Sequence, residues 1–434
     1  MIENIFIEPT RDKFKAICQR PKKDEKDLES IVSSVFDRVK KEGDKALLDF
    51  TEKFDGVSLA TVEVSAEDGK NAESAISDSL KLAIGVAKEN IEKFHRAQLT
   101  SVVDIETMNG VRCQQKSVGI ERVGIYIPGG TAPLFSTVLM LAIPAQLAGC
   151  QEIVLCSPPD KKGSIHPAII YTARLCGVDK IYKVGGAQAI AALTLGTETI
   201  PSVNKVFGPG NQYVTAAKQF AQKYGVGMDM PAGPSELLVF ANETGVPEFI
   251  AADLLSQAEH GIDSQVILLA TNQTLANEVN NALMNQLEDL PRKDIAREAL
   301  KNSKTIVITD PNLAFDFINE YGPEHLILAC EDYESYIPEI TNAGSVFLGN
   351  YCPESAGDYA SGTNHTLPTD GWAKCYNGVN VDSFSRKITF QEISKQGIQN
   401  IGKTVMEMAN NEMLVAHAKA VEIRLNVLNT EENG

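Results

Sequence analysis

From residue 123 onward, short apolar runs rich in β-branched residues alternate with segments of helical periodicity. This alternation restricts the fold more than any other feature, because strands that alternate with helices form parallel sheets covered by helices. Eight runs have the length and composition of buried strands: 123–127, 153–156, 181–184, 203–207, 237–240, 266–270, 305–309 and 346–348. Five segments between them have helical spacing: 134–147, 187–195, 213–224, 249–260 and 275–287. So many strands indicate two α/β units.

A turn-rich segment at 228–234 is the best boundary between these units. We expect an α/β protein with two incomplete Rossmann-like domains built on parallel sheets, an N-terminal arm and a C-terminal helical tail. The predicted boundaries are 1–24 for the arm, 25–124 together with 235–380 for one α/β domain, 125–234 for the other, and 381–434 for the tail. No sequence repeat relates the two units.

The composition argues against several classes of protein. A net charge of −17 argues against nucleic acid or an anionic membrane as a general partner, and no apolar run reaches the length of a membrane span. The first eight residues lack the basic start and apolar centre of a signal peptide. Eight cysteines are scattered without a Cys-x-x-Cys pair, which is typical of reduced thiols. We therefore expect a cytoplasmic protein that binds neither nucleic acid nor membrane.

Three glycine-rich loops follow predicted strands and lead into predicted helices. They are Pro128-Gly129-Gly130, Gly185-Gly186-Ala187-Gln188 and Gly208-Pro209-Gly210-Asn211. The free N–H groups at a helix start favour an anion such as a phosphate, and ligands of parallel sheets bind beyond the strand carboxyl ends. None of the loops has the dinucleotide pattern G-x-G-x-x-G. Together they indicate one phosphate-bearing ligand, whereas a single loop could be only a turn.

The predicted helix at 249–260 carries two polar side chains in its apolar stripe. Gln257 falls inside the stripe and His260 at its edge, about one turn apart on the same face. Buried polar groups need partners, and a metal ion suits both an amide oxygen and an imidazole. The alternative is a satisfied core histidine near a helix end, which these two residues taken alone favour.

Three other places combine acids with imidazoles. Glu324 and His325 lie together at a strand start after a glycine–proline turn, where they could form a general base pair or an exposed pair. The segment 350–371 has no periodicity, is longer than most connections, and offers Asp358 and His365 as candidate ligands. In the tail, Glu412 and His417 are five residues apart, roughly 140° around a helix, so they would not share a face.

Taken together, these stretches resemble the histidinol dehydrogenase family. The resemblance is densest at VGIYIPGG (123–130), VGGAQAI (184–190), FGPGN (207–211), PAGPSE (231–236) and LLSQAEHG (254–261). GPEH at 322–325 and the loop that holds Asp358 and His365 complete it. The similarity extends from about residue 42 to the tail and is poorest in the N-terminal arm. Many unrelated motifs in one order make coincidence a poor explanation.

The resemblance implies oxidation of L-histidinol through L-histidinal to L-histidine, with two NAD molecules and one Zn²⁺ per subunit of a homodimer. The implied zinc ligands are Gln257, His260, Asp358 and His417, the last contributed across the dimer by a tail that packs on the partner subunit. Glu324 and His325 match the catalytic pair, with His325 and the zinc ligands also contacting substrate. Further substrate contacts are Ser235, His365 and Glu412, and the NAD contacts are Tyr126, Gln188 and Asn211. Every one of these positions carries the family residue.

Two other functions fit parts of the sequence. An enzyme of the aldehyde dehydrogenase kind would trap its aldehyde on a cysteine thiolate, and Cys352 is the cysteine nearest the candidate site. Retained activity after Cys352→Ala would exclude that mechanism. A metal-binding α/β protein that senses a small ligand would keep the metal ligands but would have no need of Glu324 and His325 or of the three glycine-rich loops.

Overall fold

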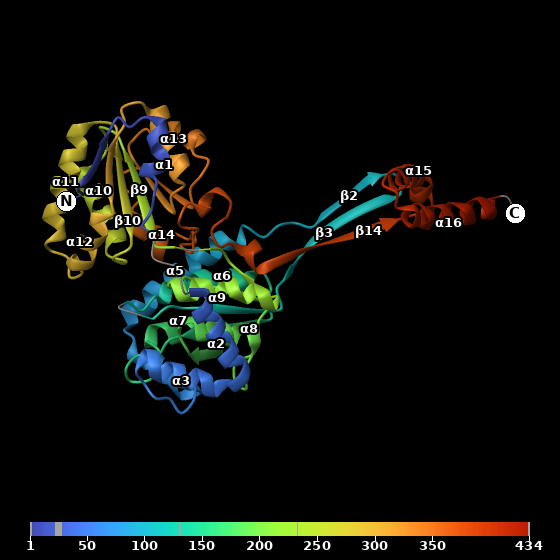
Figure 1. Cartoon of the computed structure of the whole chain (residues 1–434), viewed down its shortest axis with the longest axis horizontal. Helices are drawn as coiled ribbons and strands as arrows, with labels where there is room; N and C mark the ends of the chain where they lie inside the picture. The colour runs from blue at the N-terminus through green and yellow to red at the C-terminus, as the bar shows by residue number, and fades with distance from the viewer. Residues whose placement is uncertain (1, 22–27, 130–131, 232, 433–434) are drawn as a thin grey trace.

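The computed structural model describes residues 2–21, 28–129, 132–231 and 233–432, and within them the chain forms two parallel sheets and one antiparallel sheet (Figure 1). The first parallel sheet has five strands in the order β6-β5-β4-β7-β8. Their bounds are β4 (Arg122–Tyr126), β5 (Glu152–Ser157), β6 (Lys180–Lys183), β7 (Lys205–Phe207) and β8 (Gly227–Met228). The sheet and its helices are called the five-stranded unit below.

The second parallel sheet has six strands in the order β1-β11-β10-β9-β12-β13. Their bounds are β1 (Asn4–Ile7), β9 (Glu236–Ala241), β10 (Gln265–Ala270), β11 (Lys304–Val307), β12 (His325–Ala329) and β13 (Ser345–Leu348). The helices of this six-stranded unit are α1 (Arg11–Ile17), α10 (Pro247–Ala258), α11 (Gln273–Leu287), α12 (Lys293–Lys301), α13 (Pro311–Tyr321) and α14 (Glu354–Tyr359). All eight strands predicted from the sequence are present.

The two parallel sheets repeat one topology. Counted along the chain from β4, the five-stranded sheet has the order 3-2-1-4-5, and counted from β9 the six-stranded sheet has the same order with β1 added at its edge. Five strands in this order are the Rossmann arrangement without its sixth strand, so the predicted pair of incomplete Rossmann-like domains is confirmed. The repeat lies in the topology, and we found no counterpart in the sequence.

The helices between residues 28 and 96 pack on a different sheet from the one predicted. These helices are α2 (Leu28–Glu42), α3 (Asp44–Asp55), α4 (Ala66–Ala75) and α5 (Asp78–Arg96). They contact the helices of the five-stranded unit, which are α6 (Phe135–Leu147), α7 (Pro167–Leu175), α8 (Gly186–Leu195) and α9 (Gln212–Ala221). Grouping 25–124 with 235–380 was therefore wrong, because an amphipathic stripe shows which face is buried but not which sheet buries it.

The N-terminal arm also differs from the prediction. β1 pairs in parallel with β11, and α1 packs on α13, so the segment up to residue 20 is an integral part of the six-stranded unit. Residues 22–24 of the predicted arm lie outside the described residues. A strand of four residues is too short to show a recognisable alternation of apolar and polar residues in the sequence.

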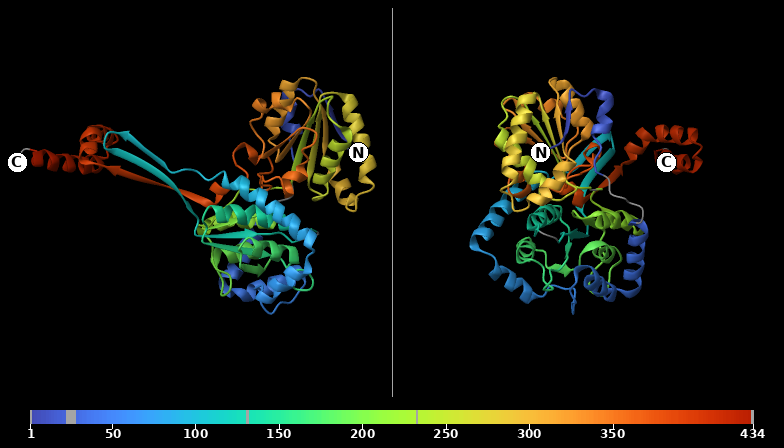
Figure 2. Two further views of the ribbon diagram at one scale, coloured as in Figure 1. Left: turned by 180° about the vertical axis from the view of Figure 1, so that it is seen from behind. Right: turned by 60° about the vertical axis from the view of Figure 1, so that its left-hand side comes forward.

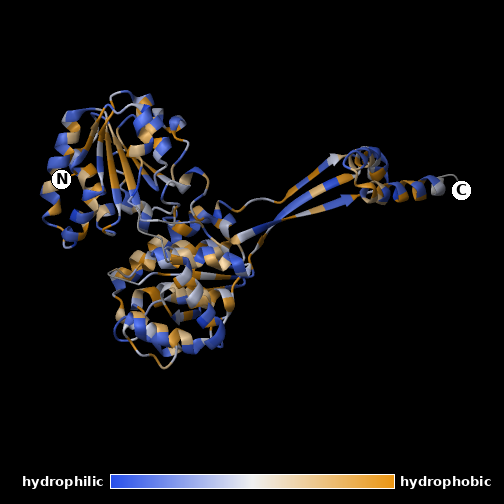
Figure 3. Ribbon diagram, in the orientation of Figure 1, coloured by the Kyte–Doolittle hydropathy of each residue, from blue (hydrophilic) through white to orange (hydrophobic). Residues whose placement is uncertain are grey.

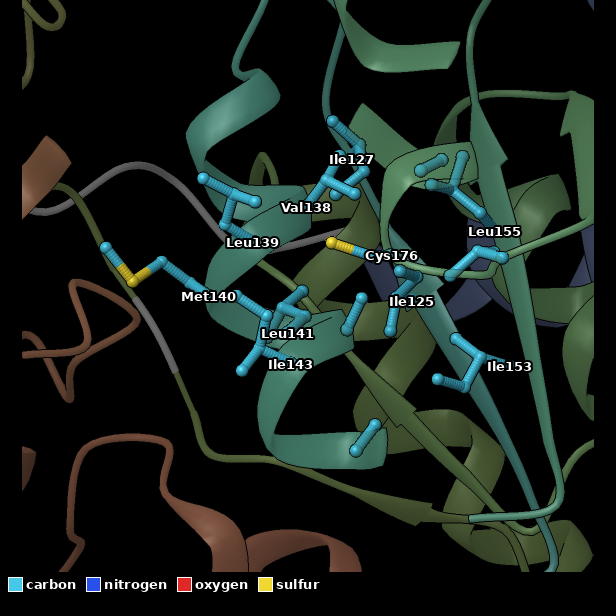
Figure 4. Close-up of a cluster of buried hydrophobic side chains, with 14 of the residues drawn as sticks. Ile125, Ile127, Val138, Leu139, Met140, Leu141, Ile143, Ile153, Leu155 and Cys176 are labelled. Carbon is cyan, nitrogen blue, oxygen red and sulfur yellow. The ribbon is translucent and has the colours of Figure 1, made fainter. Parts of the chain in front are cut away.

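The central strands of both units are largely apolar and buried, as expected for sheets covered on two faces. In the five-stranded unit, α6 is buried on nearly every side, and Figure 4 shows its side chains meeting those of β4 and β5. Figure 3 shows the same contrast across the molecule, with apolar parallel strands inside and polar outer faces on the helices. No helix within the described ranges combines the length and the apolar character needed to cross a membrane.

The third sheet extends away from both units as a stalk (Figures 1 and 2). It is antiparallel, in the order β14-β3-β2, with β2 (Val103–Met108), β3 (Val111–Gly119) and β14 (Ser385–Ile393). The helices α15 (Lys395–Asn411) and α16 (Val415–Glu432) pack together at its far end. The predicted helical tail is therefore present, but it begins with a strand, and several apolar side chains of the stalk are exposed, among them Ile105, Phe390 and Met408.

A buried ion pair fixes the loop at the point where the strand order of the five-stranded sheet reverses. Gly208, after β7, has a φ of +124°, and a Cβ there would lie 2.1 Å from the carbonyl oxygen of Tyr126 on β4. The Gly208 N–H donates to Asp229 at 2.8 Å, and Lys218 Nζ donates to the Gly208 carbonyl at 2.8 Å and to Asp229 at 2.6 Å. The side chains of Lys218 and Asp229 are each 1% exposed. The pair therefore holds the loop from both sides.

Lys218→Met should lower the free energy of unfolding by about 3–5 kcal/mol, because it leaves Asp229 buried without its cation. Lys223→Met is the matched control. Lys223 pairs with Glu29 at 2.7 Å, but both side chains are more than half exposed, so a loss below about 1 kcal/mol is expected. Urea unfolding followed by circular dichroism measures both changes. Equal losses would show that the buried pair contributes no more than the exposed one.

Candidate active site

Glu324 and His325 lie at the amino end of β12, beside the start of β9. Both side chains are buried, at 7% and 5% exposed. The backbone of Glu236 contacts both of them: its N–H donates to Glu324 Oε2 at 2.9 Å, and its carbonyl oxygen is 3.3 Å from His325 Nδ1. The exposed pair considered from the sequence is therefore ruled out, and the acid and the imidazole are held by the neighbouring strand.

Two acids of α14 complete a cluster around His325. Its Nδ1 lies 3.4 Å from Glu354 Oε1, and its Nε2 lies 3.7 Å from Asp358 Oδ1. Ligand atoms of these three residues all lie within 4.8 Å of one another. Asp358 was predicted to belong to the site, whereas Glu354 was missed. The i,i+4 spacing of Glu354 and Asp358 could have indicated it, because residues at that spacing share a helix face.

The cluster, and the helix α10 that packs against α14, contain buried polar atoms that the described part of the chain leaves without hydrogen-bond partners. These atoms are the amide nitrogen and oxygen of Gln257, both carboxylate oxygens of Glu354 and Nε2 of His325. Leaving such groups unpaired destabilises a protein, and their concentration in one place indicates a bound group that completes them. Gln257 is fully buried in the last turn of α10, as the apolar stripe predicted, but the amide is not satisfied there.

Burial sets the protonation of the cluster. It raises the pKa of Glu324 well above its ordinary value, against the effect of the Glu236 N–H, and it raises the pKa of Glu354 well above its ordinary value, with Asp358 adding to the rise. Burial also lowers the pKa of His325 to about 4, although the charge of Asp358 opposes that shift. At neutral pH His325 is thus an uncharged imidazole that can accept a proton.

Two more predicted histidines lie at the same edge. His260 follows α10 and is exposed, and its ring is close enough to Asp358, His365 and His325 for their charges to interact. His365 is half-buried; its Nδ1 is 2.8 Å from the carbonyl oxygen of Asp358, and its Nε2 is 3.1 Å from Thr137 Oγ1. Because Thr137 belongs to α6, this hydrogen bond joins the cluster to the five-stranded unit. Ser235 directly precedes β9 and is also half-buried.

The three residues predicted to bind NAD lie at the carboxyl edge of the five-stranded sheet. Tyr126 ends β4 and is 4% exposed; its hydroxyl oxygen accepts a hydrogen bond from the Gly186 N–H at 3.0 Å. Gln188 is buried in the first turn of α8. Asn211 is exposed and caps α9 by accepting hydrogen bonds from the backbone N–H groups of Tyr213 and Val214. Of the three glycine-rich loops, only the one that includes Gly130 falls partly outside the described residues.

Glu412 and His417 are not brought to the cluster in the same chain. Glu412 ends α15, and His417 lies in the first turn of α16, after a turn in which Met413 has a φ of +62°. Both side chains are exposed, and Figures 1 and 2 show this end of the stalk projecting away from both α/β units. The two residues therefore belong to different helices and share no helix face, and the break between the helices falls at a non-glycine residue with positive φ.

The comparison with protein families decides the assignment. The model of the family described as histidinol dehydrogenase matches residues 18–425 of this chain. The chain belongs to the histidinol dehydrogenase family. This confirms the resemblance seen in the sequence, and it makes the protein an enzyme of the oxidoreductase class.

Individual relatives agree with this assignment over their whole length. A histidinol dehydrogenase of Bacteroides thetaiotaomicron is 56% identical over 420 residues, which cover 97% of this chain and 98% of that protein. One from Haemophilus influenzae is 50% identical over 96% of this chain and 97% of its own. The crystal structure of histidinol dehydrogenase from Elizabethkingia anophelis superposes with a TM-score of 0.97, is 56% identical and covers 98% of each chain. The fold described above is thus the fold of this family.

Gln257→Leu should raise the stability of the protein in the presence of a metal chelator by about 1–3 kcal/mol, because it removes a buried amide that has no partner. Gln265→Leu is the matched control. That amide is also buried, but it donates to the Asn302 carbonyl oxygen at 2.9 Å and accepts from the Tyr321 hydroxyl at 2.9 Å. Its loss should destabilise the protein. Destabilisation by both substitutions in urea unfolding would contradict the idea that Gln257 awaits a ligand.

Proposed function

We propose that this protein oxidises L-histidinol through L-histidinal to L-histidine, the last step of histidine biosynthesis, with two NAD molecules and one Zn²⁺ per subunit. We further propose that it acts as a homodimer in the cytoplasm, where its eight unpaired cysteines would remain reduced. The observation that carries the proposal is the buried, uncharged His325 beside Glu324, at a sheet edge where the amide of Gln257 lacks a partner. A metal-binding sensor would need the amide but not the buried acid–base pair.

The residues proposed to hold zinc are Gln257, His260 and Asp358, together with His417 of the partner subunit. Two imidazoles, one carboxylate and one amide oxygen form a donor set that suits Zn²⁺, and the unpaired amide of Gln257 fits that role. The cluster of His325, Glu354 and Asp358 is a second conceivable set, but it would use His325 as a ligand and remove the base. When bound, zinc would orient the imidazole and the amine of the substrate.

NAD is proposed to bind at the carboxyl edge of the five-stranded sheet, against Tyr126, Gln188 and Asn211. The support is their position at the strand ends and helix starts, where parallel sheets bind phosphate-bearing ligands. The hydrogen bond between Thr137 and His365 joins this unit to the catalytic cluster. When bound, the nicotinamide would accept the hydride of each oxidation.

In the first oxidation, His325 is proposed to take the proton of the substrate hydroxyl on Nε2. That atom has no hydrogen-bond partner among the described residues, so it is free to accept. The other ring nitrogen faces the Glu236 carbonyl oxygen and Glu354, which hold the ring in one orientation. A neutral imidazole fixed in this way has the properties of a general base.

In the second oxidation, the aldehyde must first be hydrated. Glu324 is proposed to activate the attacking water, and His325, after releasing its first proton, acts again as the base. Because burial raises the pKa of Glu324, only its ionised fraction can take a proton from water, and the Glu236 N–H opposes that rise. Ser235, His365 and Glu412 are proposed as further substrate contacts, the last from the partner subunit like His417. An enclosed site shared by two subunits would keep a reactive aldehyde from solvent between the two steps.

Two molecules of NADH should form for each molecule of L-histidinol consumed, without free L-histidinal in solution. The physical reason is that one acid–base pair serves both steps at one site. Absorbance at the NADH band, with a carbonyl-trapping reagent present, measures the ratio, and a chelator-treated sample serves as the control. One NADH per substrate, with trapped aldehyde, would contradict the coupling.

His325→Asn should slow both half-reactions by about 10²–10⁴, because both lose the general base. Glu324→Gln should slow the oxidation of supplied L-histidinal much more than that of L-histidinol, because only the aldehyde step needs activated water. Single-turnover rates with each substrate measure the two steps separately. Equal losses in both steps for Glu324→Gln would refute the proposed division between the two side chains.

Mixed dimers should test whether the site is shared. His260→Ala and His417→Ala chains should each be inactive alone, because each lacks a zinc ligand. A heterodimer of the two would have one site without both ligands and one intact site, so about half of the wild-type activity per dimer is expected. Dimers that form but remain inactive would place His417 in the site of its own chain. Native mass spectrometry confirms which dimers are present.

A further inference from the structure

Arg20, near the end of the N-terminal segment, is largely buried beside the start of β9 and the residues before β12. Lys304 on β11 donates to the carbonyl oxygens of Ile17 and Gln19, which fixes the end of this segment. Arg20 follows; its side chain is 14% exposed and lies over the ring of Tyr321, with its guanidinium carbon 3.9 Å from the ring centroid. It also donates to the Tyr321 carbonyl oxygen at 2.8 Å. Such a packed guanidinium has a single orientation.

Arg20 forms a bidentate ion pair with Glu236, whose side chain is only 2% exposed. Its Nη2 donates to Glu236 Oε1 at 2.8 Å, and its Nε donates to Oε2. The hydroxyl oxygen of Tyr321 lies 3.2 Å from Oε2 of the same carboxylate and 2.9 Å from Oε1 of Gln265. Two guanidinium donors thus hold one buried carboxylate, and a planar guanidinium is the side chain that matches it on both oxygens.

The backbone of Glu236 links this ion pair to the catalytic residues. As described above, its N–H donates to Glu324, and its carbonyl oxygen faces Nδ1 of His325. The side chain and the backbone of one residue therefore connect Arg20 to both members of the pair. Asp370, the next acid near Arg20, is 3.8 Å away and more than half exposed, so it does not replace Glu236.

We propose that Arg20 is a positioning residue for Glu324 and His325, which it aligns through the ion pair with Glu236. The proposal rests on the proposed function of these two residues, and it gives the N-terminal segment a part in the reaction. The hydrogen bonds of Arg20 go to Glu236 and to the backbone of Tyr321 and Gly322, so Arg20 acts through Glu236. Its removal would leave the Glu236 carboxylate buried without a cation beside Glu324, and the strand start that aligns both catalytic side chains would shift.

The test compares Arg20→Met with Arg11→Met. Arg11 lies in the same N-terminal segment and pairs with Asp316 of α13, but both side chains are largely exposed and remote from the catalytic pair. Arg20→Met should lower kcat of both half-reactions about 10- to 100-fold, as expected for misplaced catalytic groups, while KM for NAD stays unchanged. Arg11→Met should stay within twofold of the wild type. Both are assayed well below their unfolding midpoints.

Two further variants separate positioning from stability. Arg20→Lys keeps the positive charge but cannot donate the two parallel hydrogen bonds of a guanidinium, so its kcat should lie between that of Arg20→Met and that of the wild type. The same variant replaces Arg20→Met in the test if Arg20→Met does not fold. Adding Glu236→Gln to Arg20→Met removes the unpaired charge and should restore part of kcat. A wild-type kcat per folded site in Arg20→Met or in Arg20→Lys would overturn the positioning role. A wild-type protein inactive on L-histidinol would instead overturn the proposed function.

Discussion

The parallel pairing of β9 with β12 is the constraint on which the candidate site depends. In this register His325 lies opposite Leu237, so the peptide of Glu236 meets the side chains of Glu324 and His325. Both strands are buried along their whole length, so packing on both faces of the sheet restricts their movement. The helix α10, which carries Gln257, follows β9, and α13, which carries Tyr321, precedes β12. This one strand contact positions the acid–base pair, and it places the Glu236 carboxylate where Arg20 pairs with it.

The candidate sites of the two units lie at opposite edges of sheets that share one topology. In the five-stranded unit the glycine-rich loops lie at the carboxyl edge, where such folds bind ligands. In the six-stranded unit the cluster around His325 lies at the amino edge. At the carboxyl edge there, polar side chains pair within the unit: Asn242 donates to Asp332 at 2.7 Å, and Asn350 donates to the Thr244 carbonyl oxygen at 2.9 Å. Strand order alone therefore does not locate the site.

The sequence predicted the features that depend on local pattern. All eight predicted strands are present, and Gln257 is buried on the face that its helical spacing indicated. The wrong predictions concern contacts between distant segments. The helices at 28–96 could have covered either sheet, and β1 is stabilised by β11 rather than by its own composition. Glu354 was missed although its i,i+4 spacing to Asp358 was a usable signal, and Arg20 was missed because only the folded chain brings it to Glu236.

The stalk has a consequence for how the protein is made. β3 pairs with β14, and at the end of this ladder Ser394 donates to the carbonyl oxygen of Gly110, 284 residues earlier in the chain. At a synthesis rate of about 5–20 residues per second, β3 leaves the ribosome roughly 15–60 s before its partner strand exists. During that interval β2 and β3 form at most a two-stranded ribbon, which is marginally stable in water and exposes apolar side chains such as Ile105. The stalk thus stays incomplete and exposes apolar surface in the nascent chain, and it can be completed only after the strands of both α/β units have been synthesised.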